Sequence, residues 1–330
     1  MLLPSEALIE IDKLYKGRDH VELSIGIRKN GVTETVHFGS DRKPVEGEPL
    51  VYPVGSICKP FTCSLLAKYV SEGKLDLNAP LNTYITGLPD RYYPSLEKLA
   101  THTSGYTTQP YNLLTTLPFL INQNREGGLF HTNPFRGYPL EADMMKILRD
   151  TPLKDKEYKF AYSNIGMSVL GYIVGLVSGK GFWDALTDYI KEDLGLEHTY
   201  LGNTDMTGYD KKGNPCRCWQ WEKEDIMAPA GALNSTMEDL LAFAEKNVNG
   251  ELPYLAMCHE IHGPCEGNND SGLAWRLSRS IPVSWHTGAA GPYHAWLGVN
   301  RETHTSVAVG INYGLVNAEE IGFESIRHID

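Results

Sequence analysis

The sequence predicts an α+β fold, with one antiparallel β-sheet built from both termini and flanked by helices, beside a second lobe that is mostly helical. β-Favouring runs separated by turn residues occur near the start of the chain and again in its last third. Helical apolar patterns precede the first runs, follow the last ones and dominate the middle. The simplest packing is therefore a single sheet, assembled from both ends and covered by the terminal helices.

The first residues predict a helix followed by a β-hairpin. An apolar stripe over residues 5–16 has Ser5 as a candidate N-cap and Gly17 as a stop signal. Residues 21–29 and 32–39 are β-favouring runs joined by an Asn-Gly pair, which is a strong signal for a hairpin turn.

The middle of the chain predicts several helices, because apolar residues recur there at helical spacing. We expect them over residues 61–71, 141–149, 165–178, from 182 to a stop at Gly195, and over 235–247, the last with Ser235 or Thr236 as its N-cap.

Residues 106–140 differ from the rest of the middle. They hold four prolines, a glycine pair and few charges, so we interpret them as a lid over a functional site, with a poorly ordered loop as the alternative. Trp219 and Trp221 lie in another loop-like stretch, residues 200–230, which we interpret as the rim of a cleft, with a merely packed loop as the alternative. With the lid, we expect this loop to set the size of the group that the site accepts.

Three β-favouring runs lie near the C-terminus, at residues 281–288, 293–300 and 305–312, and a helix is predicted at 318–328. We expect one domain over residues 1–330. Its sheet lobe would comprise approximately residues 1–60 plus 250–330, and its helical lobe residues 61–249.

Composition excludes several classes of function. The chain has 330 residues, a formal net charge of −11 and no basic run, which argues against nucleic acid or an anionic membrane as a partner. The N-terminal residues show neither a basic region nor an apolar stretch typical of a signal peptide. We therefore expect a cytoplasmic protein, or an exported one if a leader has been removed.

Six cysteines are few for this length. Cys216 and Cys218, and the group Cys258, His259, His262 and Cys265, lack the spacing of known zinc sites. We expect no metal and no other cofactor.

Ser56 and Lys59 form the first chemical motif. Three residues apart, they share one face of a helix, which places a hydroxyl beside an amine. A lysine that its surroundings hold neutral can take the proton from a serine and make it a nucleophile. A Ser-x-x-Lys spacing is common by chance, however, and by itself it is better explained as a solvated pair on a helix surface.

Two distant motifs add support for a catalytic role of this pair. Tyr162-Ser163-Asn164 precedes the predicted helix at 165–178, and His286-Thr287-Gly288 ends a predicted strand. The three motifs, in this order, resemble those of the penicillin-recognising serine hydrolases, a family of serine β-lactamases and penicillin-binding proteins, in its class C β-lactamase and D-alanyl-D-alanine carboxypeptidase branch. Supporting similarity covers roughly residues 45–312, including His102-Thr103-Ser104-Gly105.

The resemblance implies a β-lactamase/transpeptidase-like fold, forming a single catalytic domain, and a role for each matched residue. Ser56 would attack a carbonyl to give an acyl-enzyme, Lys59 would accept its proton, and Tyr162 would shuttle protons to the leaving group and the deacylating water. Asn164 would hydrogen-bond Lys59 and a substrate amide. The backbone N–H groups of Ser56 and Ala289 would form the oxyanion hole. Taken singly, Tyr162 is better explained as a core aromatic, Asn164 as a helix cap and His286 as an exposed strand residue. Only the motifs taken together favour the catalytic interpretation.

The third motif, formed with Thr287 and Gly288 as further substrate-binding residues, begins with His286 where many relatives have lysine. A lysine offers a substrate carboxylate a permanent charge, whereas a histidine is ordinarily largely neutral at pH 7. Within the family, histidine here is more similar to D-amino-acid peptidases and some esterases than to efficient β-lactamases.

The resemblance therefore implies a serine hydrolase acting on a small amide, a short peptide of the D-amino-acid or D-Ala carboxypeptidase type, or a β-lactam-like molecule. The first alternative is a carboxylesterase with the same nucleophile. The second is a non-catalytic binding protein that keeps the fold, which intact Ser56, Lys59, Tyr162 and Asn164 disfavour.

Overall fold

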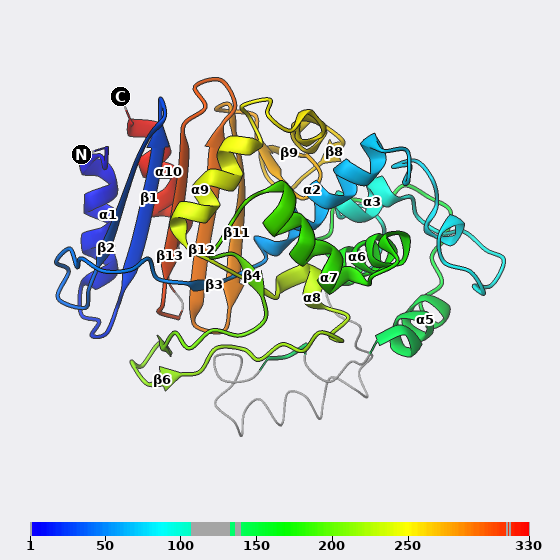
Figure 1. The fold of residues 1–330 in the computed structure, drawn as a ribbon, viewed down its shortest axis with the longest axis horizontal. Coiled ribbons are helices and arrows are strands. Elements are labelled where there is room, and N and C mark those ends of the chain that lie inside the picture. Colours follow the sequence, from blue (N-terminus) through cyan, green and yellow to red (C-terminus); the bar gives the residue numbers. More distant parts are fainter. Residues whose placement is uncertain (1, 107–132, 136–139, 315, 317, 330) are drawn as a thin grey trace.

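The computed structural model describes residues 2–106, 133–135, 140–314, 316 and 318–329 (Figure 1). Most of the stretch interpreted as a lid, residues 106–140, lies outside the described residues.

An eight-stranded antiparallel sheet forms one side of the molecule, with the strand order β2-β1-β13-β12-β11-β10-β9-β8. The N-terminal hairpin joins the C-terminal strands through the pairing of β1 with β13, in which Leu23 faces Ile311. The sheet is thus built from both ends of the chain, as predicted. Its strands are β1 (Leu23–Lys29), β2 (Val32–Phe38), β8 (Gly263–Pro264), β9 (Asn269–Ser271), β10 (Arg276–Ser278), β11 (Val283–Ala290), β12 (Tyr293–Asn300) and β13 (Ser306–Ile311).

Helices cover both faces of this sheet. On one face, α1 (Ser5–Tyr15) and α10 (Ala318–His328) lie side by side at the edge where both termini are found (Figure 1). On the other face, α9 (Met237–Lys246) packs against β1, β12 and β13. The two-lobe division stays a prediction. The contacts of α9 place this helix against the sheet, although the predicted boundary at 249 assigns it to the helical lobe.

Burial on both faces explains the continuous apolar runs of the central strands. In β12, Trp296 packs with the terminal helices, whereas its neighbours Ala295 and Leu297 pack with the core of the helical lobe. Side chains alternate between the faces of a strand, so a strand covered on both sides needs apolar residues at every position.

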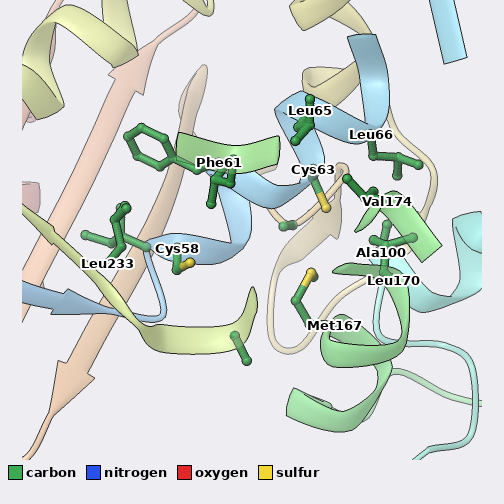
Figure 2. Close-up of a cluster of buried hydrophobic side chains, with 14 of the residues drawn as sticks. Cys58, Phe61, Cys63, Leu65, Leu66, Ala100, Met167, Leu170, Val174 and Leu233 are labelled. Carbon is green, nitrogen blue, oxygen red and sulfur yellow. The ribbon is translucent and has the colours of Figure 1, made fainter. Parts of the chain in front are cut away.

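The helical lobe is arranged around α2 (Cys58–Ser71), ten of whose residues are buried. Figure 2 shows Cys63, Leu65 and Leu66 of α2 close to Met167, Leu170 and Val174 of α6 (Asn164–Ser178). The same helical region contains α3 (Leu96–Ala100), α5 (Leu140–Asp150), α7 (Phe182–Asp188), α8 (Ala228–Gly231), the π-helical turn η3 (Tyr189–Asp193) and the 3-10 turn η1 (Leu81–Thr83). The 3-10 turn η4 (Pro253–His259) also packs against α2, although the predicted boundary at 249 assigns it to the sheet lobe.

A second, three-stranded sheet is absent from the sequence prediction. It has the order β3-β7-β4, formed by Tyr52–Gly55, Leu233–Ser235 and Tyr200–Leu201. A separate pair joins β5 (Gly208–Tyr209) to β6 (Pro215–Cys216). Strands of two to four residues are too short to show an alternating pattern, which is why the sequence does not reveal them.

Helix ends agree with the predictions to within a few residues. Thr236 caps α9, since its side chain accepts a hydrogen bond from Asp239 N. Ser5, predicted as an N-cap, is instead the first residue of α1, after Pro4. The second helix begins at Cys58, three residues before the predicted start.

No single helix among the described residues combines the length and apolar composition needed to cross a membrane. The segments Asn164–Ser178 and Phe182–Asp193 reach that length and composition only when they are taken together, and they are bent by 76° relative to each other.

Candidate active site

Ser56 lies in the turn between β3 and α2, two residues before the helix begins and not at its first position. The turn is pressed against β11. A Cβ on Gly55 would overlap the backbone carbonyl of Ala289, and a Cβ on Gly288 would overlap the carbonyl of Val54. Gly55 also has a φ of 49°, in the left-handed region that favours glycine. Two glycines therefore let the first and third motifs meet backbone to backbone.

Lys59 extends from the first turn of α2 and is completely buried. Its Nζ donates hydrogen bonds to Ser56 Oγ at 2.9 Å and to the carbonyl of Ala230 at 2.6 Å. Pro60 follows without disrupting the helix, because the first N–H groups of a helix have no intrahelical acceptor. The amine and the hydroxyl thus lie within proton-transfer distance.

Tyr162 comes from the stretch before α6 and lies beside the lysine. Lys59 Nζ is 4.9 Å from the centroid of its ring, within the range of a cation–π interaction. The next residue, Ser163, caps α6 by accepting a hydrogen bond from Gly166 N. The Tyr-x-Asn motif is therefore fixed by the start of a helix.

Asn164, the first residue of α6, differs from its expected role. The amine of Lys59 is held by Ser56 and Ala230, and Asn164 Oδ1 has no hydrogen-bond partner among the described residues. Asn164 nevertheless lines the same cavity as Ser56, where the family resemblance places a substrate amide.

His286 is buried in β11, with its ring centroid 6.3 Å from that of Tyr162. Burial, then the positive charges of Lys59 and Arg276, hold the pKa of His286 well below its ordinary value. Its Nδ1 lies 2.6 Å from the carbonyl of Thr287, which can only accept. The proton of the neutral ring is therefore on Nδ1, and Nε2 is left as an acceptor. The third motif has a histidine that carries no charge at neutral pH.

Ser56 opens into a cavity of about 140 Å³, called the Ser56 cavity below. It is lined by Ser56, Phe135, Asn164, Trp219, Trp221, Met227, Ala230, Gly231 and Ala289. Ser56 and Ala289 border it together, so a carbonyl bound here can reach the backbone N–H groups that the resemblance assigns to the oxyanion hole. Thr287 is half-buried beside them.

Three aromatic residues form one wall of the Ser56 cavity. Phe135 meets Trp219 edge to face, with centroids 5.9 Å apart, and lies nearly parallel to Trp221 at 6.2 Å. Buried Asn133 holds this arrangement, because its Nδ2 donates to the carbonyl of Gln220 at 2.8 Å. The wall offers a flat, apolar surface to one side of a bound molecule.

The structure thus brings Ser56, Lys59, Tyr162, Asn164 and the third motif together from three distant segments. Ala230 and Phe135 were not predicted to take part. A backbone carbonyl carries no sequence signal, and Phe135 lies in a segment without periodicity. Trp219 and Trp221 do line the cavity, as the sequence suggested.

The six cysteines are free thiols, and Cys258 and Cys63 are buried. Across the described parts of the chain, no three His, Cys, Asp or Glu side chains converge as a metal site would require.

Comparison with known proteins identifies the family. A family model described as Beta-lactamase matches residues 11–321. The chain belongs to the β-lactamase family. Similar curated proteins include a β-lactamase of Providencia stuartii, 28% identical over 72% of this chain and 58% of that protein, and the putative penicillin-binding protein PbpX of Bacillus subtilis, 24% identical over 68% of this chain and 54% of that protein. The match therefore spans just over half the length of these two relatives.

Solved structures of this family share the fold. A class C β-lactamase of Rhodobacter sphaeroides matches with a TM-score of 0.77 at 20% identity, covering 99% of both chains. A β-lactamase/D-alanine carboxypeptidase of Pseudomonas syringae matches with a TM-score of 0.77 at 19% identity over 100% of both. The predicted β-lactamase/transpeptidase-like fold is confirmed.

Proposed function

We propose that this chain is a serine acyl hydrolase that works through a Ser56 acyl-enzyme. The observation that carries the proposal is the buried amine of Lys59, which lies 2.9 Å from Ser56 Oγ at the edge of the Ser56 cavity. Burying the amine of a lysine completely costs free energy. Its contact with a serine hydroxyl next to a cavity is the arrangement that nucleophilic catalysis needs.

In the proposed reaction, Ser56 Oγ attacks the carbonyl carbon while its proton passes to Lys59 Nζ. The oxyanion that forms is stabilised by the N–H groups of Ser56 and Ala289. The tetrahedral intermediate then expels the leaving group, which takes up a proton through Tyr162. A water molecule attacks the ester of Ser56, gives up its proton along the same route, and releases the acid and the free hydroxyl.

The substrate class that we propose is a small amide or peptide, including D-aminoacyl compounds, with no free carboxylate next to the scissile bond. By the family resemblance a substrate carboxylate would be recognised at the third motif, where the buried ring of His286 is neutral and lacks the charge of a lysine. Arg276 is ion-paired to Glu266. We therefore expect carboxypeptidase-type and β-lactam substrates to react more slowly than neutral ones.

A carboxylesterase is the second candidate, favoured by the aromatic wall of the Ser56 cavity. Phe135, Trp219 and Trp221 suit an apolar, flat acyl group, and an ester needs no carboxylate recognition. The two candidates share the nucleophile and differ in the leaving group.

The nucleophile is tested with a fluorophosphonate probe and intact-mass spectrometry. We expect stoichiometric labelling of the wild type, no labelling of Ser56→Ala, and normal labelling of Ser40→Ala, which removes an exposed serine hydroxyl. A folded wild type that is neither labelled nor active on any substrate would favour the non-catalytic binding protein instead.

The substrate class is tested with matched pairs. The same N-acyl dipeptide is assayed as the free acid and as the C-terminal amide, and the same aromatic acyl group is assayed as a p-nitrophenyl ester and as a p-nitroanilide. We expect higher kcat/KM for the amide than for the free acid. A clear preference for the free acid or for a cephalosporin contradicts the proposed substrate class, and turnover of the ester alone selects the carboxylesterase.

A further inference from the structure

His102 contacts the backbone on both sides of Tyr162. Its carbonyl accepts a hydrogen bond from Ala161 N at 2.9 Å, and its Nδ1 accepts one from Ser163 N at 3.2 Å. The residues immediately before and after Tyr162 are therefore both tied to this one histidine. Such a pair of bonds fixes the position of the tyrosine backbone relative to α3, which ends just before His102.

The ring of His102 also packs against the ring of Tyr162. Their centroids are 4.6 Å apart at 41°, and the ring of Phe160 meets the His102 ring edge to face at 5.8 Å. The space left between His102, Tyr162 and His286 is only about 10 Å³. A gap of this size holds about one water molecule, so the rings have little room to move apart.

The burial of His102 costs free energy that a residue with a purely space-filling role would not need to spend. His102 is 4% exposed, and its Nε2 has no hydrogen-bond partner among the described residues. Its φ of 59° lies in a region that residues other than glycine seldom adopt. An apolar ring would avoid the burial of an unpaired N–H group, whereas only a side chain with an acceptor can hold Ser163 N.

The protonation state of His102 suits a fixed contact. Ser163 N–H can only donate, so Nδ1 is the accepting nitrogen and the ring proton is on Nε2. Burial, then the charges of Lys59 and Arg276, lower the pKa of His102 to about 3. The ring therefore stays neutral, and its bond to Ser163 persists, through the neutral pH range.

We infer that His102 is a positioning residue for Tyr162, holding its phenol where the proton transfers at Ser56 need it. The inference rests on the proposed acyl-transfer function, since Tyr162 can be mispositioned only for a reaction that uses it. It assigns a role to the His-Thr-Ser-Gly stretch that the three motifs leave unexplained.

A double-mutant cycle tests the inference. We measure kcat and KM on a p-nitrophenyl ester for the wild type, His102→Ala, Tyr162→Phe and the double variant. We expect His102→Ala to lower kcat about ten- to a hundredfold in the wild-type background with little change in KM, as misplacement of a catalytic group does. In the Tyr162→Phe background we expect less than about a twofold effect, because the hydroxyl to be positioned is gone.

Two further variants serve as a replacement for His102→Ala, should it not fold, and as a control for lost stability. His102→Leu fills a similar volume but removes the acceptor for Ser163 N, and the same cycle is measured with it if His102→Ala does not fold. His259→Gln alters another buried histidine, bonded to Ser284 and Asn247, and should lower stability without changing kcat of the folded protein.

Equal loss of kcat from the His102 substitution in both backgrounds would overturn the inference, since it would show a structural effect independent of the hydroxyl. Unchanged kcat in a folded His102 variant would overturn it as well. A wild type that fluorophosphonate does not label is a different result, which refutes the proposed function itself.

Discussion

Lys59 Nζ and Ser56 Oγ lie 2.9 Å apart, and the lysine that makes this contact is completely buried. The carbonyl of Ala230, 2.6 Å from the same nitrogen, holds the amine in place without supplying a negative charge. A backbone carbonyl can only accept, so this contact fixes the amine beside the serine hydroxyl. This pairing leaves the amine able to exchange a proton with the serine.

Lys59→Ala is therefore expected to lower the rate of acylation by at least about a hundredfold, the usual effect of removing a proton-transfer group. The measurement is the second-order rate of fluorophosphonate labelling. Lys68→Ala is the matched control, because Lys68 lies in the same helix but pairs with Asp193 at 2.5 Å. Similar rates in Lys59→Ala and the wild type would refute the role of Lys59 as base.

His286→Lys should restore a positive charge to the third motif. We expect the ratio of kcat/KM for the free-acid dipeptide to that for its amide to rise about tenfold, because an ammonium group attracts the carboxylate that a neutral ring does not. The variant should also be less stable, since it places an ammonium group at a buried position close to Lys59 and Arg276. His286→Gln, which adds no charge, should leave the ratio unchanged.

Trp219→Ala should remove part of the aromatic wall. We expect kcat/KM for an aromatic acyl ester to fall about tenfold, and that for the acetyl ester to change by less than about twofold, because the ring contributes only to the larger group. Trp183→Ala, on α7 and outside the lining of the Ser56 cavity, serves as control. Equal losses on both esters would argue against a specificity role.

Gly288→Ala should damage the junction between β11 and β3. The added Cβ would overlap the carbonyl of Val54, so one of the two backbones must move. We expect a loss of about 1–3 kcal/mol in the free energy of unfolding, measured by urea denaturation, together with slower acylation. Gly263→Ala in β8 is the control, because a Cβ there meets no atom within 4 Å.

Stability should fall as the pH is lowered from about 6.5 to 4. Burial is the first cause of a lowered pKa in His102 and His259, to about 3 each, and in His294, to about 4. In this pH range the unfolded chain binds protons that the folded chain does not, so stability is present above pH 6.5 and decreases on acidification. Each histidine contributes up to about 1.4 kcal/mol per pH unit.

Urea unfolding at pH 7.5, 5.5 and 4.5 measures this slope. His259→Gln should reduce it, whereas His198→Gln, at an exposed position, should not. A free energy of unfolding that does not change between pH 7.5 and 4.5 would contradict the assignment of these rings as neutral.

The sequence predicts the parts of the fold that long patterns encode. The run at 293–300 coincides with β12, and the Asn-Gly pair marks the turn between β1 and β2. The motifs around Ser56, Tyr162 and His286 place the site because each needs specific residue types. These features are local, so they can be read without knowing which segments meet.

The remaining features depend on contacts between distant segments. The carbonyl of Ala230 reaches Lys59 only because α8 packs against α2, and any residue type would supply that oxygen. The expected bond from Asn164 to Lys59 is replaced by this carbonyl. Similarly, the role of His102 emerges from two bonds across some sixty residues of chain.

The pairing of β1 with β13 has a consequence for how the protein is made. On the ribosome, the N-terminal hairpin and the Ser56 turn emerge early, yet β13 separates β1 from β12 in the sheet. The hairpin cannot join the sheet until residues 306–311 have been synthesised, and contacts across almost the whole chain, such as Leu23 with Ile311, slow the search for the native pairing. Until then the apolar side chains of β1 lack their native partners and are open to non-native contacts.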